Sequence, residues 1–173
     1  MRNKYQHSFA TDPFHPLAGE KGIFVCGGEG DSDYGNLLNA ARKAVFHGYN
    51  VYILPNPKGL RTPDFIFEQK GIYRVYDLKT IIGKNSASNR LRESIGQANR
   101  VLLNMRCEYK AKVLALDIQN YFETSPDARE VMVLYNRKVT SYEATFNKKW
   151  SRNVLSYSPR KAASGMAETS RPV

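Results

Sequence analysis

The fold is decided by two short stretches, TPDFIF at residues 62–67 and IYRVYDLK at residues 72–79. Both are rich in the β-branched and aromatic residues that favour strands, so they predict strands at residues 64–68 and 72–79. Only Gln-Lys-Gly, residues 69–71, separates these strands. A short link that contains glycine is typical of a hairpin. The sequence therefore predicts an antiparallel hairpin.

Three charged side chains of this hairpin are expected to converge. Asp64 opens the first strand, and Asp77 and Lys79 share one face of the second because strand side chains alternate. Two carboxylates at one point suit a hard divalent cation, Mg²⁺ or Mn²⁺, which lowers the pKa of bound water. A lysine beside it can orient that water or stabilise charge on phosphorus. The alternative is that both aspartates are turn or edge-strand residues and Lys79 is ordinary surface charge.

A helix and two strands are predicted before the hairpin. The apolar run at residues 23–26 indicates a short strand, and Asp-Ser-Asp at residues 31–33 offers N-cap residues. Apolar residues at helical spacing predict a helix over residues 36–47, which Gly48 ends. Residues 49–54 read as the next strand.

Further helices and strands are predicted after the hairpin. Apolar residues at helical spacing between positions 91 and 105 predict a second long helix, and residues 112–119 read as a buried strand. Ser-Pro-Asp at residues 125–127 is typical of a helix start, so a third helix is expected to reach Tyr135. Late strands are expected at residues 139–146 and 154–157. The fold class is therefore α/β, with a central mixed sheet that contains the hairpin and is flanked by helices.

Length and composition exclude several classes of protein. The 173 residues suit one domain, and a hydrophobic fraction of 42% is enough for a sizeable core. No stretch approaches the roughly 18 apolar residues of a membrane span, and the N-terminus lacks the apolar run of a signal peptide. Cys26 and Cys107 cannot build a disulfide framework or a four-cysteine zinc site, although a single bridge stays open. A reducing, cytoplasmic site of action is expected, and delivery from a larger secreted precursor stays open.

The charge of the chain points to a polyanionic partner. Lysine and arginine number 26 against 16 acidic residues, which gives a formal net charge of +10. The excess is concentrated at residues 79–112 and 136–173, each with 8 basic and 2 acidic groups. Neutralised phosphates release counterions, so such blocks favour binding of nucleic acid. A solvated basic surface is the alternative.

The hairpin also resembles a known family. Pro63-Asp64 followed by Asp77-Leu78-Lys79 resembles the signature of the PD-(D/E)XK nuclease superfamily. The longer run from Gly48 through Thr80 is similar to the C-terminal toxin domains of contact-dependent growth inhibition (CdiA) proteins, which are tRNA nucleases. The resemblance covers roughly residues 34–120 and implies a restriction-endonuclease-like core.

The resemblance implies roles for particular residues. Asp64, Asp77 and the backbone carbonyl of Leu78 would bind Mg²⁺ or Mn²⁺, and Lys79 would be the catalytic lysine. Many members of the superfamily carry a further glutamate on the first helix, but the matching helix here has no acidic residue. Either Asp33 substitutes for it from the start of this helix, or fewer residues hold the metal.

Other polar residues are assigned to the substrate. Gln97 matches a glutamine that similar families place beside the site, where it would contact a phosphate oxygen or hold the lysine; a solvent-facing glutamine is the alternative. Tyr73 and Tyr76 are candidates for stacking on unpaired bases, with a core or sheet-surface role as the alternative. The remaining residues expected to bind the sugar-phosphate backbone are Thr80, Lys84, Arg90, Arg92 and Arg100.

The sequence thus predicts three parts and one activity. Residues 1–33 are expected to be an irregular lead-in with a short strand, residues 34–157 a nuclease domain, and residues 158–173 a flexible basic tail. The expected activity is metal-dependent hydrolysis of RNA, with tRNA favoured, by a toxin domain that has a cognate immunity protein. A DNA endonuclease from a restriction, repair or mobile-element system and a non-catalytic nucleic-acid-binding protein are the alternatives.

Overall fold

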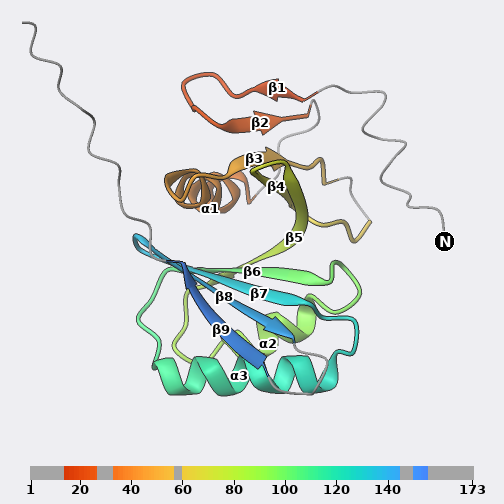
Figure 1. Cartoon of the computed structure of the whole chain (residues 1–173), viewed down its shortest axis with the longest axis vertical. Coiled ribbons are helices and arrows are strands. Elements are labelled where there is room, and N and C mark those ends of the chain that lie inside the picture. Colours follow the sequence, from red (N-terminus) through yellow and green to blue (C-terminus); the bar gives the residue numbers. More distant parts are fainter. Residues whose placement is uncertain (1–13, 27–32, 57–59, 145–149, 156–173) are drawn as a thin grey trace, which may run out of the picture.

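In the part of the chain that the structure describes, the predicted hairpin forms the centre of a nine-stranded mixed sheet with three helices (Figure 1). The structure, a computed structural model, describes residues 14–26, 33–56, 60–144 and 150–155. The strands are β1 (His15–Pro16), β2 (Ile23–Val25), β3 (Asn50–Ile53), β4 (Phe65–Gln69), β5 (Ile72–Ile81), β6 (Arg100–Met105), β7 (Glu130–Tyr135), β8 (Lys138–Ala144) and β9 (Trp150–Leu155). The helices are α1 (Tyr34–Phe46), α2 (Ala87–Glu93) and α3 (Ala111–Thr124).

The strands lie in the sheet in the order of the chain, from β1 to β9. Parallel neighbours follow wherever a helix intervenes, so α1 connects β2 to β3, α2 connects β5 to β6, and α3 connects β6 to β7. The remaining neighbours are antiparallel. This arrangement confirms the predicted α/β class, with a central mixed sheet flanked by helices. The ten residues of β5 join the two halves of the sheet.

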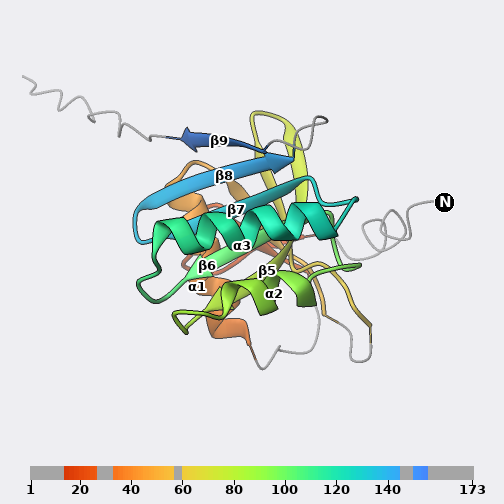
Figure 2. The same cartoon turned by 90° about the horizontal axis from the view of Figure 1, so that it is seen from below.

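The helices cover the two faces of the sheet unequally. The alanine-rich side of α1 packs on one face against residues of β3, β4, β5 and β7. On the opposite face, α2 and α3 pack only against the half formed by β5 to β8, where Leu91, Leu114 and Ile118 meet Val101, Leu103 and Val131. Figure 2 shows α2 and α3 side by side over this half. No described helix is long and apolar enough to cross a membrane.

The predicted second long helix is wrong. The helix α2 ends at Glu93, and Gly96 follows with a φ of +84°, in the left-handed region where glycine is favoured. The apolar residues after it form β6, whose residues from Val101 to Met105 are all buried. A central parallel strand is buried on both faces and therefore reads as a continuous apolar run, which also fits a helical pattern.

Two further predictions are wrong, because a predicted strand is a helix and part of a predicted helix is a strand. Residues 112–119, predicted as a buried strand, lie in α3, which buries Leu114, Ile118 and Tyr121 at helical spacing. Residues 130–135, predicted as part of a helix that begins at Ser125, form β7. Proline commonly follows the end of a helix because it cannot continue one, and Pro126 has this place just after α3.

The other predicted elements are confirmed where the structure describes them. The strand at residues 23–26, the helix at 36–47, the strand at 49–54 and the hairpin correspond to β2, α1, β3 and β4–β5, and the late strands to β8 and β9. Cys26 and Cys107 do not form a disulfide. The predicted basic tail at residues 158–173 lies outside the described residues.

A buried acid ties β5 and β8 to the start of β7. Glu130 is 5% exposed. Its carboxylate accepts hydrogen bonds from Tyr76 Oη at 3.0 Å and Ser141 Oγ at 2.6 Å, and it lies 3.2 Å from Arg100 Nε. The Nε atom of Arg74 is 4.0 Å away. These donors offset the cost of burying the charge.

Replacing this carboxylate is expected to destabilise the fold. In Glu130→Ala the free energy of unfolding should fall by about 3–5 kcal/mol, because buried donors lose their acceptor. Glu143 lies opposite it on β8 and is exposed, so Glu143→Ala should change stability by no more than about 0.5 kcal/mol. Urea unfolding followed by circular dichroism measures both. Equal losses in the two variants would contradict the structural role of the Glu130 network.

A buried histidine makes stability depend on pH. Burial lowers the pKa of His47 below its usual value. At this residue the unfolded chain therefore binds a proton more readily than the folded protein does. The contribution of His47 to the free energy of unfolding is complete above about pH 6.5 and is lost as the pH falls through the folded-state pKa. The difference in unfolding free energy between the wild type and His47→Gln should shrink from pH 7.5 to pH 5. A difference that stays constant over this range would refute the assignment.

Candidate active site

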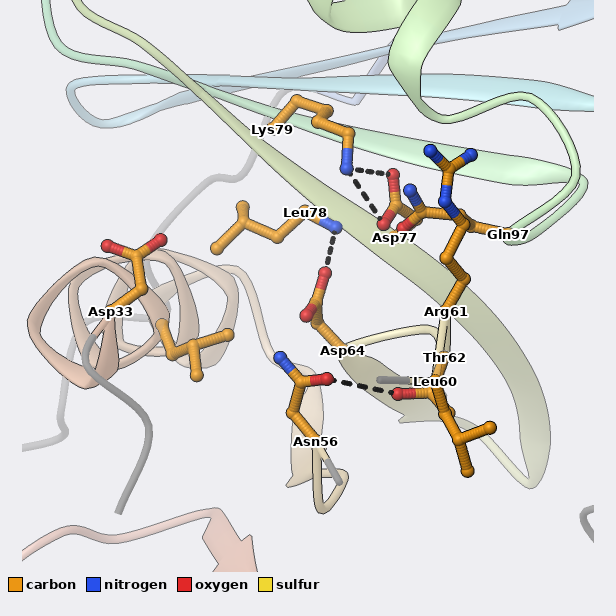
Figure 3. Close-up of a pocket in the computed structure, with 11 residues that line it drawn as sticks. Asp33, Asn56, Leu60, Arg61, Thr62, Asp64, Asp77, Leu78, Lys79 and Gln97 are labelled. Atoms are coloured by element: carbon orange, nitrogen blue, oxygen red, sulfur yellow. Dashed lines mark hydrogen bonds and ion pairs between the residues drawn. The ribbon is translucent and has the colours of Figure 1, made fainter. Parts of the chain in front are cut away.

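The hairpin brings its charged residues into one pocket of about 280 Å³ (Figure 3). Asp64 stands just before β4, and its backbone N–H donates to the carbonyl of Tyr76 at 3.0 Å. This bond holds Asp64 against β5 just beyond the last register pair, Phe65 with Tyr76, and Asp64 lines the same pocket as Asp77. The residues that line the pocket are Asp33, Leu37, Asn56, Leu60, Arg61, Thr62, Asp64, Asp77, Leu78, Lys79 and Gln97.

The central side chains are fixed by short contacts. The Oδ2 atom of Asp64 accepts a hydrogen bond from the backbone N–H of Leu78 at 2.6 Å. The ammonium of Lys79 lies 3.0 Å from Asp77 Oδ1 and 2.8 Å from its Oδ2. Asp77 is 1% exposed. The predicted convergence of Asp64, Asp77 and Lys79 is therefore present in the structure.

Burial and the neighbouring side chains act on the pKa of Asp77 in opposite directions. Burial raises the pKa of Asp77, and the neighbouring Lys79 and a hydrogen bond with Asp64 act in the opposite direction. Asp64 and Asp77 line the same pocket, and two carboxyl groups that lie close together are costly to ionise at once unless a proton or another cation lies between them. The pair therefore suits a cation.

Gln97 lies in the pocket, although no helix places it there. The chain turns after α2, where the N–H of Gln97 donates to the carbonyl of Ser94 at 3.0 Å. Its side-chain amide donates to the carbonyl of Glu93, also at 3.0 Å. The prediction that Gln97 lies beside the site is therefore confirmed, whereas the prediction that a helix carries it is wrong.

Asp33 lines the same pocket from another side. It stands at the N-cap position of α1, where its carboxylate accepts a hydrogen bond from the Asn36 side chain. Figure 3 shows it across the pocket from Asp77. Within the described part of the chain, no three His, Cys, Asp or Glu residues are grouped closely enough to hold a metal ion. Asp64 and Asp77 are the two carboxylates that line the pocket beside Lys79, with Asp33 on its α1 side.

The residues predicted to bind the substrate backbone do not line this pocket. The Thr80 side chain is on the opposite face of β5 from Asp77 and Lys79, because strand side chains alternate. Lys84 lines a second pocket with Lys110. Arg90 pairs with Glu93 at 2.8 Å on the surface of α2, where Arg92 is also exposed.

Two other predicted side chains are engaged inside the fold. The guanidinium of Arg100 contacts the buried Glu130, as described above. Tyr76 is fully buried, which is inconsistent with base stacking, whereas Tyr73 is 64% exposed. Binding of nucleic acid by Thr80, Lys84, Arg90, Arg92 and Arg100 stays a prediction.

Five lining residues were not predicted as site residues from the sequence, and Arg61 is the charged one among them; the others are Leu37, Asn56, Leu60 and Thr62. Arg61 is exposed, and Figure 3 shows it extending from its loop toward the part of the pocket that holds Asp77 and Gln97. In the same loop, the Thr62 hydroxyl donates to Asn56 Oδ1 at 3.4 Å. The available signal was the position of Arg61, three residues before Asp64. A guanidinium at this position can form a bidentate pair of hydrogen bonds with two oxygens of a phosphate.

The contact between Asp64 and the Leu78 amide gives a prediction. Asp64→Ala removes the acceptor, so the Leu78 N–H should exchange with solvent faster than in the wild type. Asp64→Asn keeps a side-chain oxygen and should retain most of the protection. Hydrogen exchange followed by NMR measures this amide, and the Tyr76 amide serves as a reference in the same spectra. Equal protection of Leu78 in the two variants would show that the side chain does not hold this backbone.

Comparisons with known proteins give one family. Residues 61–139, somewhat under half of the chain, match the family described as the contact-dependent growth inhibition CdiA C-terminal domain. Among solved structures, the chain is similar to one described as "CdiA-CT/CdiI toxin and immunity complex from Burkholderia pseudomallei". That match has 18% identity, covers 73% of this chain and 89% of the other, and has a TM-score of 0.39. No curated protein matches. Through residues 61–139, the chain is therefore similar to CdiA C-terminal domains.

Proposed function

We propose that the chain is a metal-dependent nuclease of the restriction-endonuclease-like, PD-(D/E)XK type. The observation that carries this proposal is the placement of Asp64, Asp77 and Lys79 in one pocket, where the Lys79 ammonium lies 3.0 Å from Asp77 Oδ1. A carboxylate pair beside a lysine can act on the phosphodiester bond, whose hydrolysis needs a positioned water and stabilisation of negative charge.

The proposed cofactor is Mg²⁺ or Mn²⁺. Asp64, Asp77 and the carbonyl of Leu78 would hold it, because hard cations prefer oxygen donors of this kind. Asp33 lines the α1 side of the pocket and would have to move toward Asp64 and Asp77 to become an additional ligand. When bound, the cation would lower the pKa of a water molecule and neutralise charge on the phosphate.

The cationic and amide side chains of the pocket have distinct proposed roles. Lys79 is held 2.8 Å from Asp77, so its ammonium is positioned to orient the attacking water or stabilise charge on phosphorus. Arg61 has a planar guanidinium that suits phosphate oxygens, and we assign it to the scissile or adjacent phosphate. Gln97 would donate a hydrogen bond to the substrate from the turn after α2.

The proposed substrate is RNA, in particular tRNA, and the proposed biological role is that of a toxin domain. The net charge of +10 supports a polyanionic substrate. The similarity of residues 61–139 to CdiA C-terminal domains supports contact-dependent growth inhibition. Such a domain would be delivered from a larger protein into the cytoplasm of a target cell, and it would have a cognate immunity protein.

A cleavage assay tests this function. Purified protein is incubated with total tRNA and with plasmid DNA, with Mg²⁺ or with EDTA. Discrete tRNA fragments should require the metal. Asp77→Asn and Lys79→Met should each reduce the rate at least about 100-fold, the size of effect seen when one transition-state donor is removed. The exposed Asp127→Asn and Lys138→Met make the same chemical changes away from the pocket and should keep the wild-type rate.

Other outcomes would redirect the assignment. Nicked plasmid with intact tRNA would identify a DNA endonuclease. Salt-sensitive binding of nucleic acid without any cleavage would identify a binding protein. Metal-independent cleavage that survives Asp77→Asn would remove this pocket from the mechanism.

A further inference from the structure

Four aromatic side chains form a continuous surface on the first half of the sheet. We call it the aromatic platform; its members are Phe14, Phe24, Tyr52 and Tyr73. Tyr52 lies at its centre. Its ring stacks on Phe24, with centroids 4.8 Å apart and planes 17° apart, and lies 6.4 Å from the ring of Tyr73. Phe14 meets Tyr52 edge to face at 5.2 Å.

The aromatic platform is on the same face of the sheet as the candidate active site. Tyr73 and Asp77 lie four residues apart on β5, so their side chains share a face and stand about 13 Å apart along the strand. Tyr52 lies opposite Ile66, and Ile66 lies opposite Val75, which stands between Tyr73 and Asp77. The surface therefore runs from the platform to the carboxylates without changing face.

No described helix packs over this part of the sheet. The apolar side of α1 lies on the opposite face, and α2 and α3 pack against the half from β5 to β8, the lower half in Figure 1. Tyr73 is 64% exposed, and Phe14, Phe24 and Tyr52 are partly exposed. An aromatic surface that is left open in this way suits a ligand.

The position of the platform favours unpaired nucleotides as that ligand. Aromatic rings stack on bases that are not already stacked in a duplex, and such contacts tolerate any base. The distance of about 13 Å to Asp77 corresponds to roughly two to four nucleotides. Glu68 lies beside Tyr73, and its carboxylate accepts hydrogen bonds from Asn50 Nδ2 and the Gly71 amide. These two donors partly neutralise the negative charge that a nucleotide on Tyr73 would meet.

We infer that the aromatic platform binds unpaired bases next to the phosphate that is cut, so that the enzyme acts on single-stranded segments such as loops and ends. This inference rests on the proposed nuclease function for the link to cleavage, although binding itself does not need catalysis. The ligand of the aromatic platform is thus an unpaired base, which RNA and DNA single strands both offer.

Binding and stacking are measured separately in the inactive Asp77→Asn background. A 12-nucleotide RNA, the same DNA sequence and the corresponding RNA duplex are titrated by fluorescence anisotropy. A 2-aminopurine in the single strands reports stacking by a loss of its fluorescence. Tyr73→Ala should weaken single-strand binding by at least about 5-fold, and Tyr73→Ala with Tyr52→Ala by more. Tyr73→Phe keeps the ring and should retain both affinity and quenching.

The matched control is Ile72→Ala. Ile72 is 56% exposed and precedes Tyr73 on β5, where it points to the opposite face. It should leave binding unchanged. The duplex should bind more weakly than the single strand and should not respond to Tyr73→Ala.

The possible results separate the platform from the nuclease function. Unchanged single-strand binding and quenching in Tyr73→Ala would overturn the platform, even if the wild type cleaves tRNA. Tyr73-dependent binding without wild-type cleavage would support the platform and reject the nuclease. If instead the wild type self-associates, Tyr73→Ala abolishes that association and nucleotide binding is unaffected, the surface is an interface between two copies. The RNA and DNA arms identify which strand is preferred.

Discussion

The pairing of β4 with β5 is the constraint on which the rest of the structure depends. The strand β5 belongs to both halves of the sheet, antiparallel to β4 and parallel to β6. Its alternation sends Tyr76 and Leu78 into the core below α1 and turns Asp77 and Lys79 to the other face. A shift of one residue in this register would exchange the core side chains for the charged ones. The same pairing therefore fixes both the core and the candidate site.

Two buried acids, Asp77 on β5 and Glu130 on β7, show how different surroundings give different roles. Glu130 has two hydroxyl donors and a guanidinium within 3.2 Å, which together satisfy both of its oxygens. Asp77 has the Lys79 ammonium at 2.8 Å, and the carboxyl groups of Asp64 and Asp33 line the same pocket. The first arrangement has no capacity left for a ligand and serves the fold. The second is stabilised only in part, which is typical of sites that bind a cation or substrate.

The sequence predicted what depends on local pattern and missed what depends on neighbours. The hairpin and α1 carry turn and capping residues beside clear strand or helix patterns, and both were predicted. Residues 101–105 were assigned to a helix because a strand buried on both faces has no alternation to recognise. Gln97 was expected beside the site but on the wrong helix, and Arg61 was not predicted, because a turn and a loop bring them to the pocket and local periodicity does not determine those paths. The charged centre of the pocket was thus predictable from the hairpin, whereas Arg61 was not.

The open half of the sheet follows from the connections between its strands. Between β3 and β5 the described residues form no helix that could cover the second face of these strands. A sheet face exposed to water usually alternates to polar residues, and this one carries Phe24, Tyr52 and Tyr73 instead. The faces of these rings are apolar, so they are stabilised more by stacking against a flat ligand than by contact with water. Because β5 carries Tyr73 and Asp77 on one face, a ligand on those rings would lie beside the carboxylates, so the proposed binding and the proposed chemistry share one strand.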